Sequence, residues 1–355
     1  MTKIKSNHPI KFWAGILLAQ FVLFYLLSKM DAAVGLFVHL FEVKKYVHQK
    51  LFSFLSFSVG DVFYTVLAVV LFYHLLQLVK GPERKGAAKN LFIFLNIFYF
   101  VYQSVWGMLY FQKPLAEKLH EHTLRSEELK ILAEIYLEKC RETRKQVNEN
   151  EQGVFIIINE RDLKKDLLFQ ETKIPSYFNS RNSVGVLSLK PSIFDSVMSY
   201  TGILGYYNPF TAEAQYNAEL PSTYLPFTLA HESAHQLGYA REEEANFIGY
   251  LIGKNAANRD LRYSTEYFVL KSLLRSLKED DSAFVEKLIM SFSPEMQRDR
   301  LAEKEFAEKH DGLLNVIFGI SNDLFLKSNQ QDGAASYSYF VDLLLRYERD
   351  EVEYK

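Results

Sequence analysis

The chain has 355 residues and a formal net charge of −2 at pH 7, with 48% hydrophobic and 15% aromatic residues. The length allows more than one domain. The near-neutral charge and the dispersed Lys and Arg residues argue against a nucleic acid partner. The single cysteine, Cys140, excludes an internal disulfide, and its charged helical surroundings suit an ordinary thiol better than a nucleophile.

The first 112 residues are rich in apolar side chains and contain three stretches that predict membrane spans. These stretches cover about residues 10–28, 62–79 and 91–111, and each is long and nearly free of charge. Residues 33–57 carry too many charges to span a membrane and predict amphipathic helices at its surface. A cleaved signal peptide is the alternative for the first stretch, and buried helices of a soluble protein are the alternative for all three.

Basic residues predict how these spans are oriented. Lys3, Lys5 and Lys11 lie before or at the start of the first span, and a basic loop at 80–89 joins the second span to the third. Because basic loops tend to stay in the cytoplasm, we expect the N-terminus inside and the remainder of the chain outside.

The remaining residues resemble a soluble protein. Helical patterns recur at 114–150 and 260–355, whereas Pro, Gly, Ser and Tyr recur at 173–225 and predict short strands and turns. The segment at 203–217 either holds a substrate backbone by strand addition or is a buried connector.

The most informative pattern is a His-Glu-x-x-His sequence formed by His231, Glu232 and His235. On a helix, positions i and i+4 lie on one face, so both imidazoles can bind one zinc ion. A Glu beside the first His can then act as general base on water. Two unrelated His on a surface helix are the alternative, because so short a pattern also occurs by chance.

The residues after this motif predict a third zinc ligand. Gly238 can end the helix in a left-handed conformation, and a second helical pattern begins near Arg241. Such a turn can swing a carboxylate under the two His and leave a fourth coordination position open. Glu242 is the first candidate for this ligand and Glu244 is the second.

Several segments resemble the membrane family called domain of unknown function 3810, found in Gram-negative bacteria. The similarity runs through SFSVGDVFY at 56–64, WGMLYF at 106–111, residues 184–217, the motif region at 225–251 and FLKSNQQDGAASYSYFVDLLLRY at 325–347. The resemblance implies a zinc-peptidase-like site with no established substrate. Together with the charge pattern it implies a multi-pass protein of the bacterial inner membrane, with a periplasmic catalytic domain.

A looser resemblance is to the gluzincin peptidases. In a membrane-bound group of these enzymes the third ligand lies in an Arg-Glu-x-x-Ala-Asp sequence, and Arg241-Glu242-x-x-Ala245-Asn246 is similar. The resemblance implies that Glu242 is the ligand. Asn246 replaces the Asp of that group, and the six residues between His235 and Glu242 are a shorter separation than the group has.

We therefore expect a mainly α protein in two parts. Residues 1–112 form the three transmembrane helices. Residues 113–355 form a zincin-like α+β metallopeptidase domain, with a small sheet and a helical C-terminal part.

The predicted activity is hydrolysis of peptide bonds by a zinc-activated water, with a peptide or an envelope protein as substrate. Glu232 is the expected general base. A further donor should stabilise the oxyanion, and Tyr337 and Tyr207 are candidates, although ordinary packing explains either tyrosine as well. Two other functions stay open: a non-catalytic zinc-containing scaffold of the envelope, and a zinc hydrolase that acts on a cell-wall amide.

Overall fold

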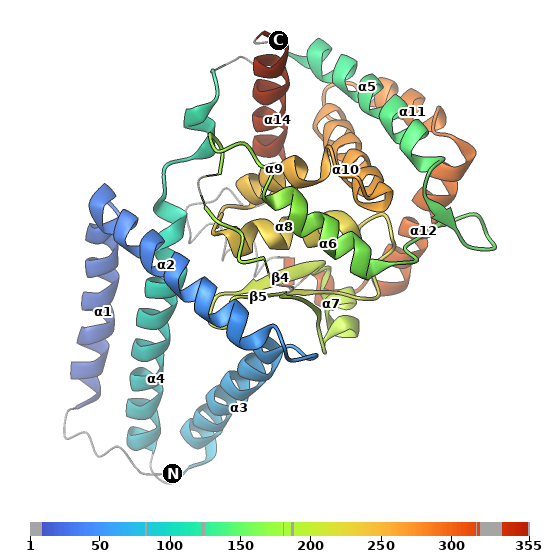
Figure 1. The fold of residues 1–355 in the computed structure, drawn as a ribbon. Coiled ribbons are helices and arrows are strands. Elements are labelled where there is room, and N and C mark those ends of the chain that lie inside the picture. The colour runs from blue at the N-terminus through green and yellow to red at the C-terminus, as the bar shows by residue number, and fades with distance from the viewer. Residues whose placement is uncertain are drawn as a thin grey trace.

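The computed structural model describes residues 9–81, 84–121, 125–179, 181–185, 188–316, 318–319 and 336–353, and in the last range it describes side chains from 339 to 350. Most of these residues are helical, and the strands form two small sheets. Figure 1 shows a compact helical body above a group of helices from the N-terminal part. The expectation of a mainly α protein is confirmed.

Four helices make up the N-terminal part: α1 (Ile10–Leu27), α2 (Asp31–Phe52), α3 (Val59–Lys80) and α4 (Arg84–Val105). Of the described helices, α1 and α3 are long and apolar enough to cross a membrane, with mean hydropathies of 1.9 and 2.1. They match the first two predicted spans. Only 6% and 0% of these stretches is buried, so their apolar side chains face outward rather than into a protein core.

The prediction of a third apolar span at 91–111 is wrong. Helix α4 begins with a basic turn, ends at Val105 and carries polar side chains that lower its hydropathy. One of these, Asn96, is buried against α1, where it accepts from Gln20 and donates to the Trp13 carbonyl oxygen. The remaining residues form the 3-10 helix η1 (Gly107–Phe111), which packs into the protein.

Helix α2 is the predicted charged helix, and it crosses the bundle at the end that faces the body (Figure 1). Phe41 is buried against Trp106 and Tyr207. Lys45 is buried as well, and its Nζ lies 2.8 Å from Glu42 and 3.5 Å from the Leu237 carbonyl oxygen. These contacts fix α2 beneath the helix that carries the His-Glu-x-x-His motif.

The body is built around two adjacent helices, α8 (Leu225–Leu237) and α9 (Glu242–Gly253), which are buried along most of their length. Helix α10 packs against both and α14 packs against α9, and the main hydrophobic core joins these elements. The surrounding elements are η2 (Leu115–Lys118), α5 (Ser126–Arg144), α6 (Glu160–Glu171), α7 (Asp195–Thr201), α10 (Arg259–Leu277), α11 (Ser282–Met290), α12 (Pro294–His310) and α14 (Ser336–Glu353).

The larger sheet has three short strands in the order β3-β5-β4 and packs against α8. Strand β5 (Glu213–Tyr216) is central, parallel to β3 (Leu189–Pro191) and antiparallel to β4 (Gly205–Asn208). Gly205 pairs with Tyr216 in this register. A separate hairpin joins β1 (Asn148–Glu149) to β2 (Phe155–Ile156).

A buried network of charges joins the start of α3 to this sheet. Asp61 is fully buried and accepts hydrogen bonds from the Ile193 amide at 2.8 Å and from the Tyr206 hydroxyl. Glu213 accepts from the Gly60 amide at 2.7 Å and from Lys190 Nζ at 2.6 Å. Removing one partner from such a pair leaves an uncompensated buried charge, which costs about 3–5 kcal/mol. The network therefore holds α3 rigidly against β4 and β5.

Candidate functional site

The central helix α8 carries the motif through the interior of the body. Pro226 occupies its first turn, where the missing amide hydrogen costs nothing. The helix ends at Gly238, whose φ of +101° is a left-handed conformation that only glycine adopts readily. This turn reverses the chain and lets α9 return along α8.

Helix α9 brings its first turn to the motif. The Arg241 guanidinium donates to the Tyr110 carbonyl oxygen at 3.1 and 3.2 Å and to the Gln112 carbonyl oxygen at 3.1 Å, which anchors the start of the helix. Glu242 and Asn246 are one helical turn apart, so both lie on the face of α9 that meets α8.

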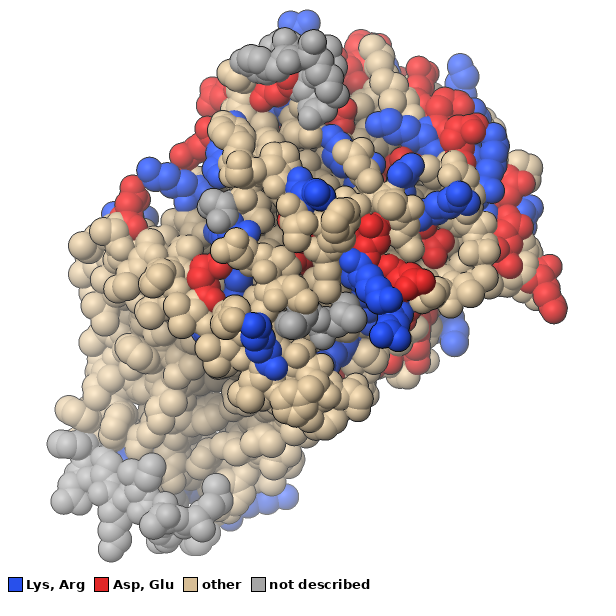
Figure 2. Space-filling model, in the orientation of Figure 1, with Lys and Arg blue, Asp and Glu red and all other residues tan. Residues whose placement is uncertain are grey.

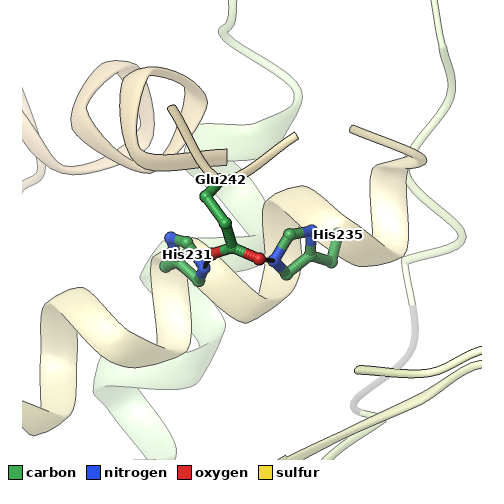
Figure 3. Close-up of side chains that lie close together, drawn as sticks. All are labelled: His231, His235 and Glu242. Carbon is green, nitrogen blue, oxygen red and sulfur yellow. Dashed lines mark ion pairs between the residues drawn. The ribbon is translucent and has the colours of Figure 1, made fainter. Parts of the chain in front are cut away.

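The structure brings His231, His235 and Glu242 together. Figure 3 shows the Glu242 carboxylate pointing at both imidazole rings. Its two oxygens lie 3.2 Å from Nε2 of His231 and 3.7 Å from Nε2 of His235. One nitrogen or oxygen from each of the three residues lies within 4.8 Å of the others. Three groups that were predicted from sequence as ligands thus face one small volume.

Both imidazoles are held by their other nitrogen. Nδ1 of His231 donates to Oδ1 of Asn246 at 2.8 Å, and Nδ1 of His235 donates to the Tyr239 carbonyl oxygen at 2.6 Å. Because a carbonyl oxygen only accepts, each Nδ1 carries the hydrogen, and in the neutral ring Nε2 presents a lone pair. The tautomer that binds metal is therefore fixed on both rings.

The charges of the cluster favour a cation. Burial alone would lower the pKa of His235, but the facing Glu242 carboxylate raises it above its usual value. Burial alone would raise the pKa of Glu242, but the two imidazoles hold it well below its usual range. Two lone pairs and a carboxylate that face one another repel unless a proton or a metal ion lies between them.

The donor set fits zinc. Two imidazole nitrogens and one carboxylate are the protein ligands of many catalytic zinc sites, with a fourth position left for water. Tetrahedral ligands about 2 Å from an ion stand roughly 3.3 Å from one another. The separations of 3.2 Å between Oε2 of Glu242 and His231 and of 3.7 Å between Oε1 of Glu242 and His235 are close to that spacing.

Glu232 lies beside this cluster and is buried. Its Oε2 has no hydrogen-bond partner among the described residues, and burial raises its pKa to about 7. Gly205 on strand β4 makes room for it, since a Cβ there would lie 2.7 Å from Oε1 of Glu232. A buried carboxylate with a free oxygen can take up and release a proton near neutral pH.

Comparison with known families gives one match. The model described as "Protein of unknown function (DUF3810)" matches residues 37–345, which is most of the chain. The chain belongs to the DUF3810 family. Neither the curated proteins nor the solved structures compared with this DUF3810 protein give a match, so the zincin-like fold stays a prediction.

The second candidate for a third ligand in this DUF3810 chain, Glu244, lies elsewhere. Its Oε1 accepts from the Leu115 amide at 2.8 Å and lies 3.7 Å from the Arg241 guanidinium. Burial raises the pKa of Glu244 to about 7. The structure thus turns Glu242 toward the two histidines and Glu244 toward the segment before α5.

The structure describes the side chain of one of the two tyrosine candidates for the oxyanion donor. Tyr207 lies on β4 with its ring 4.7 Å from that of Trp106, and its buried hydroxyl has no partner in the described part of the chain. The Tyr337 side chain lies outside the described residues. The role of either tyrosine as a donor stays a prediction.

A mostly apolar cavity of about 880 Å³ opens at the cluster. His231, Glu232, His235, Glu242 and Asn246 line it on the side of α8 and α9, and residues 203–207 line it along β4. The start of α3 contributes Tyr64, the end of α4 contributes Tyr102, and Trp106 follows directly after α4. An extended chain that lies in this cavity would pass beside both β4 and Glu232.

Three features of the DUF3810 site are not evident from the motif. Asn246 holds His231, the Tyr239 carbonyl oxygen holds His235, and Gly205 accommodates Glu232. The spacing of four residues between Glu242 and Asn246 is a usable signal for the first of these. No local pattern signals the other two, because they depend on the turn after α8 and on the packing of β4.

Proposed function

We propose that this DUF3810 protein is a membrane-anchored zinc-dependent metallopeptidase. The observation that supports it most is the set of three acceptor groups from His231, His235 and Glu242 that face one another with both histidine tautomers fixed. Such a cluster is electrostatically favourable only with a proton or a metal ion between its members, and we assign that place to a metal ion.

The residues divide into ligands and a base. His231, His235 and Glu242 would hold Zn²⁺, which when bound supplies Lewis acidity that makes water a nucleophile near neutral pH. Glu232 would accept a proton from the attacking water on its free Oε2 and deliver it to the leaving amine. A pKa of about 7 suits both halves of that task.

Strand β4 supports a peptide as the substrate. It is an edge strand, and within the described ranges no strand pairs with its side opposite β5. A substrate backbone can therefore add to this edge, next to Glu232. Tyr207 on the same strand has a buried hydroxyl with no partner among the described residues, which suits a donor to the oxyanion.

The membrane part of the proposal rests on α1 and α3. Figure 2 shows charged side chains over the body and almost none over the face formed by α1, α3 and α4. Helix α1 begins and α3 ends at the same end of this group, near basic sequence (Figure 1). We place that end in the cytoplasm and the body in the bacterial periplasm. The substrate would then be a peptide or an envelope protein.

The variant Glu232→Gln tests this function. It removes the base while keeping the shape of the side chain, so the full chain should still bind one zinc per molecule and lose hydrolysis of unfolded peptides. Metal analysis and peptide cleavage are measured on the same samples. A Glu232→Gln protein that cleaves as well as the parent would disprove the mechanism, and a parent that binds zinc without cleaving peptides would point to a scaffold.

A further inference from the structure

The catalytic cavity is shared between the body and the N-terminal helices. Tyr64 on α3 and Tyr102 on α4 line it together with His231 and Glu232. Helix α3 is one of the two described helices long and apolar enough to span a membrane, and Tyr64 lies in its second turn. The wall of the cavity is therefore continuous with a helix whose apolar side chains face away from the protein.

This shared wall is held rigidly. The Tyr64 ring lies 5.9 Å from the Tyr206 ring on β4, and the Tyr206 hydroxyl donates to buried Asp61 on α3. The turn after β4 places Phe210 between the two helices, with ring separations of 4.8 Å from Phe63 and 5.6 Å from Phe98. The edge strand that borders Glu232 is thus fixed to the ends of α3 and α4.

An exposed apolar rim lies next to the same helix end. Val197 on α7 is 57% exposed and Leu204 is 38% exposed, and both line the cavity. Ile193, at 59% exposed, donates its amide to Asp61 and so lies beside the start of α3. Apolar side chains gathered at one place on a surface mark a contact with a membrane or a partner.

We propose that the substrate is the segment of a membrane-anchored protein that emerges directly from the bilayer, and that it enters the cavity over the rim formed by Ile193, Val197 and Leu204. This inference rests on the proposed peptidase function and narrows its substrate class. The rim lies at the start of α3 and would rest on the bilayer surface. Strand β4 favours a peptide over a lipid, because its amides and carbonyls match a peptide backbone and not an acyl chain.

The test uses the full chain in phospholipid vesicles. The first probe is a membrane-spanning Leu/Ala helix followed by a randomised segment of about twenty residues. The second probe inserts a Gly/Ser spacer of about ten residues after the helix, and the third is the randomised segment alone. Mass spectrometry locates the cuts. The first two probes share one vesicle surface and one effective concentration, so their difference reports distance from the bilayer.

We expect cuts in the first probe to cluster at the residues nearest the bilayer. The spacer should lower cleavage of the randomised segment by about tenfold, because it carries that segment away from the rim. Val197→Asp should lower the ratio of first-probe to third-probe cleavage, whereas Ile135→Asp on the distant helix α5 should not change it. Glu232→Gln should cleave none of the probes.

The outcomes separate the two proposals. Equal cleavage with and without the spacer, or a ratio insensitive to Val197→Asp, would overturn the membrane-side entry and leave the peptidase intact. A parent chain that cuts no probe would overturn both proposals. Release of fatty acid from the vesicle lipid would overturn the peptide assignment in favour of a lipid substrate.

Discussion

Two pairs of apolar helices in this protein have opposite surroundings. In α8 every residue except His231 is buried, and α9 is buried from Glu244 to its end. In α1 only Phe24 is buried, and in α3 only Gly60 and Asp61. Both pairs are largely apolar, so apolar content alone does not decide what covers a helix. The difference lies in the polar groups that each helix carries.

Helix α8 carries polar side chains that only a protein interior can satisfy. Ser233 donates to buried Glu171 on α6, and Gln236 donates to the Ser188 and Ala212 carbonyl oxygens. Helix α3 has no comparable interior requirement beyond its first turn, where the buried network holds Asp61. Lipid offers no hydrogen bonds, and the exposed apolar side chains of α3 need none. A lipid environment can therefore cover α3 as protein covers α8.

The largest expected contrast comes from the same substitution in both regions. Phe247 on α9 is 0% exposed and packs against Phe178 and Tyr347, whereas Phe72 on α3 is 63% exposed. Phe247→Ala should lower the free energy of unfolding by about 3–5 kcal/mol because it opens a cavity. Phe72→Ala should change it by less than about 0.5 kcal/mol. Denaturant unfolding of the full chain in detergent measures both, and equal losses would contradict the contrast.

A charge placed at two depths tests whether lipid covers α3. Val69, at the middle of α3, and Val79, at its end, are 63% and 66% exposed. Val69→Lys should raise the apparent free energy of membrane insertion of this segment by about 2.5–3.5 kcal/mol, since the ammonium would lie in hydrocarbon. Val79→Lys should have little effect, because its side chain reaches the interface. Equal insertion of the two variants would place α3 in water.

The smallest of these effects comes from the hydrogen bond that Asn246 makes with the proposed zinc ligand His231. Asn246→Ala removes the acceptor that holds His231 and should weaken zinc binding by about 10–100-fold. Asn246→Asp keeps an acceptor oxygen at the same place and should bind zinc at least as tightly as the parent. Competition with a chelator measures all three affinities. If Asn246→Ala matches the parent, the hydrogen bond to His231 has no role in the site.

Local patterns predicted the parts of the fold that local chemistry determines. The spacing of four between His231 and His235 put both rings on one helix face, and Gly238 marked the turn that follows. Long uncharged stretches located α1 and α3. The third stretch misled because its helix begins earlier, in the basic sequence at Arg84, and ends at Val105, and the residues after it form η1 and pack into the protein.

Other features depend on contacts between distant segments. The choice between Glu242 and Glu244 stayed open in the sequence because it depends on the exact start of α9, which Arg241 fixes through the Tyr110 and Gln112 carbonyl oxygens. The buried network around Asp61 and the shared wall of the cavity join residues more than a hundred positions apart. No local pattern encodes such pairings.

The most direct test of the central claim is the zinc content of two matched variants. Glu242→Gln removes the carboxylate that faces both histidines, whereas Glu244→Gln removes a neighbouring buried carboxylate and keeps an oxygen for the Leu115 amide. We predict that the parent and Glu244→Gln each retain one tightly bound zinc per chain and that Glu242→Gln does not. A Glu242→Gln protein that holds zinc as tightly as the parent would contradict the assignment of Glu242, and a parent that binds no zinc would contradict the metal site itself.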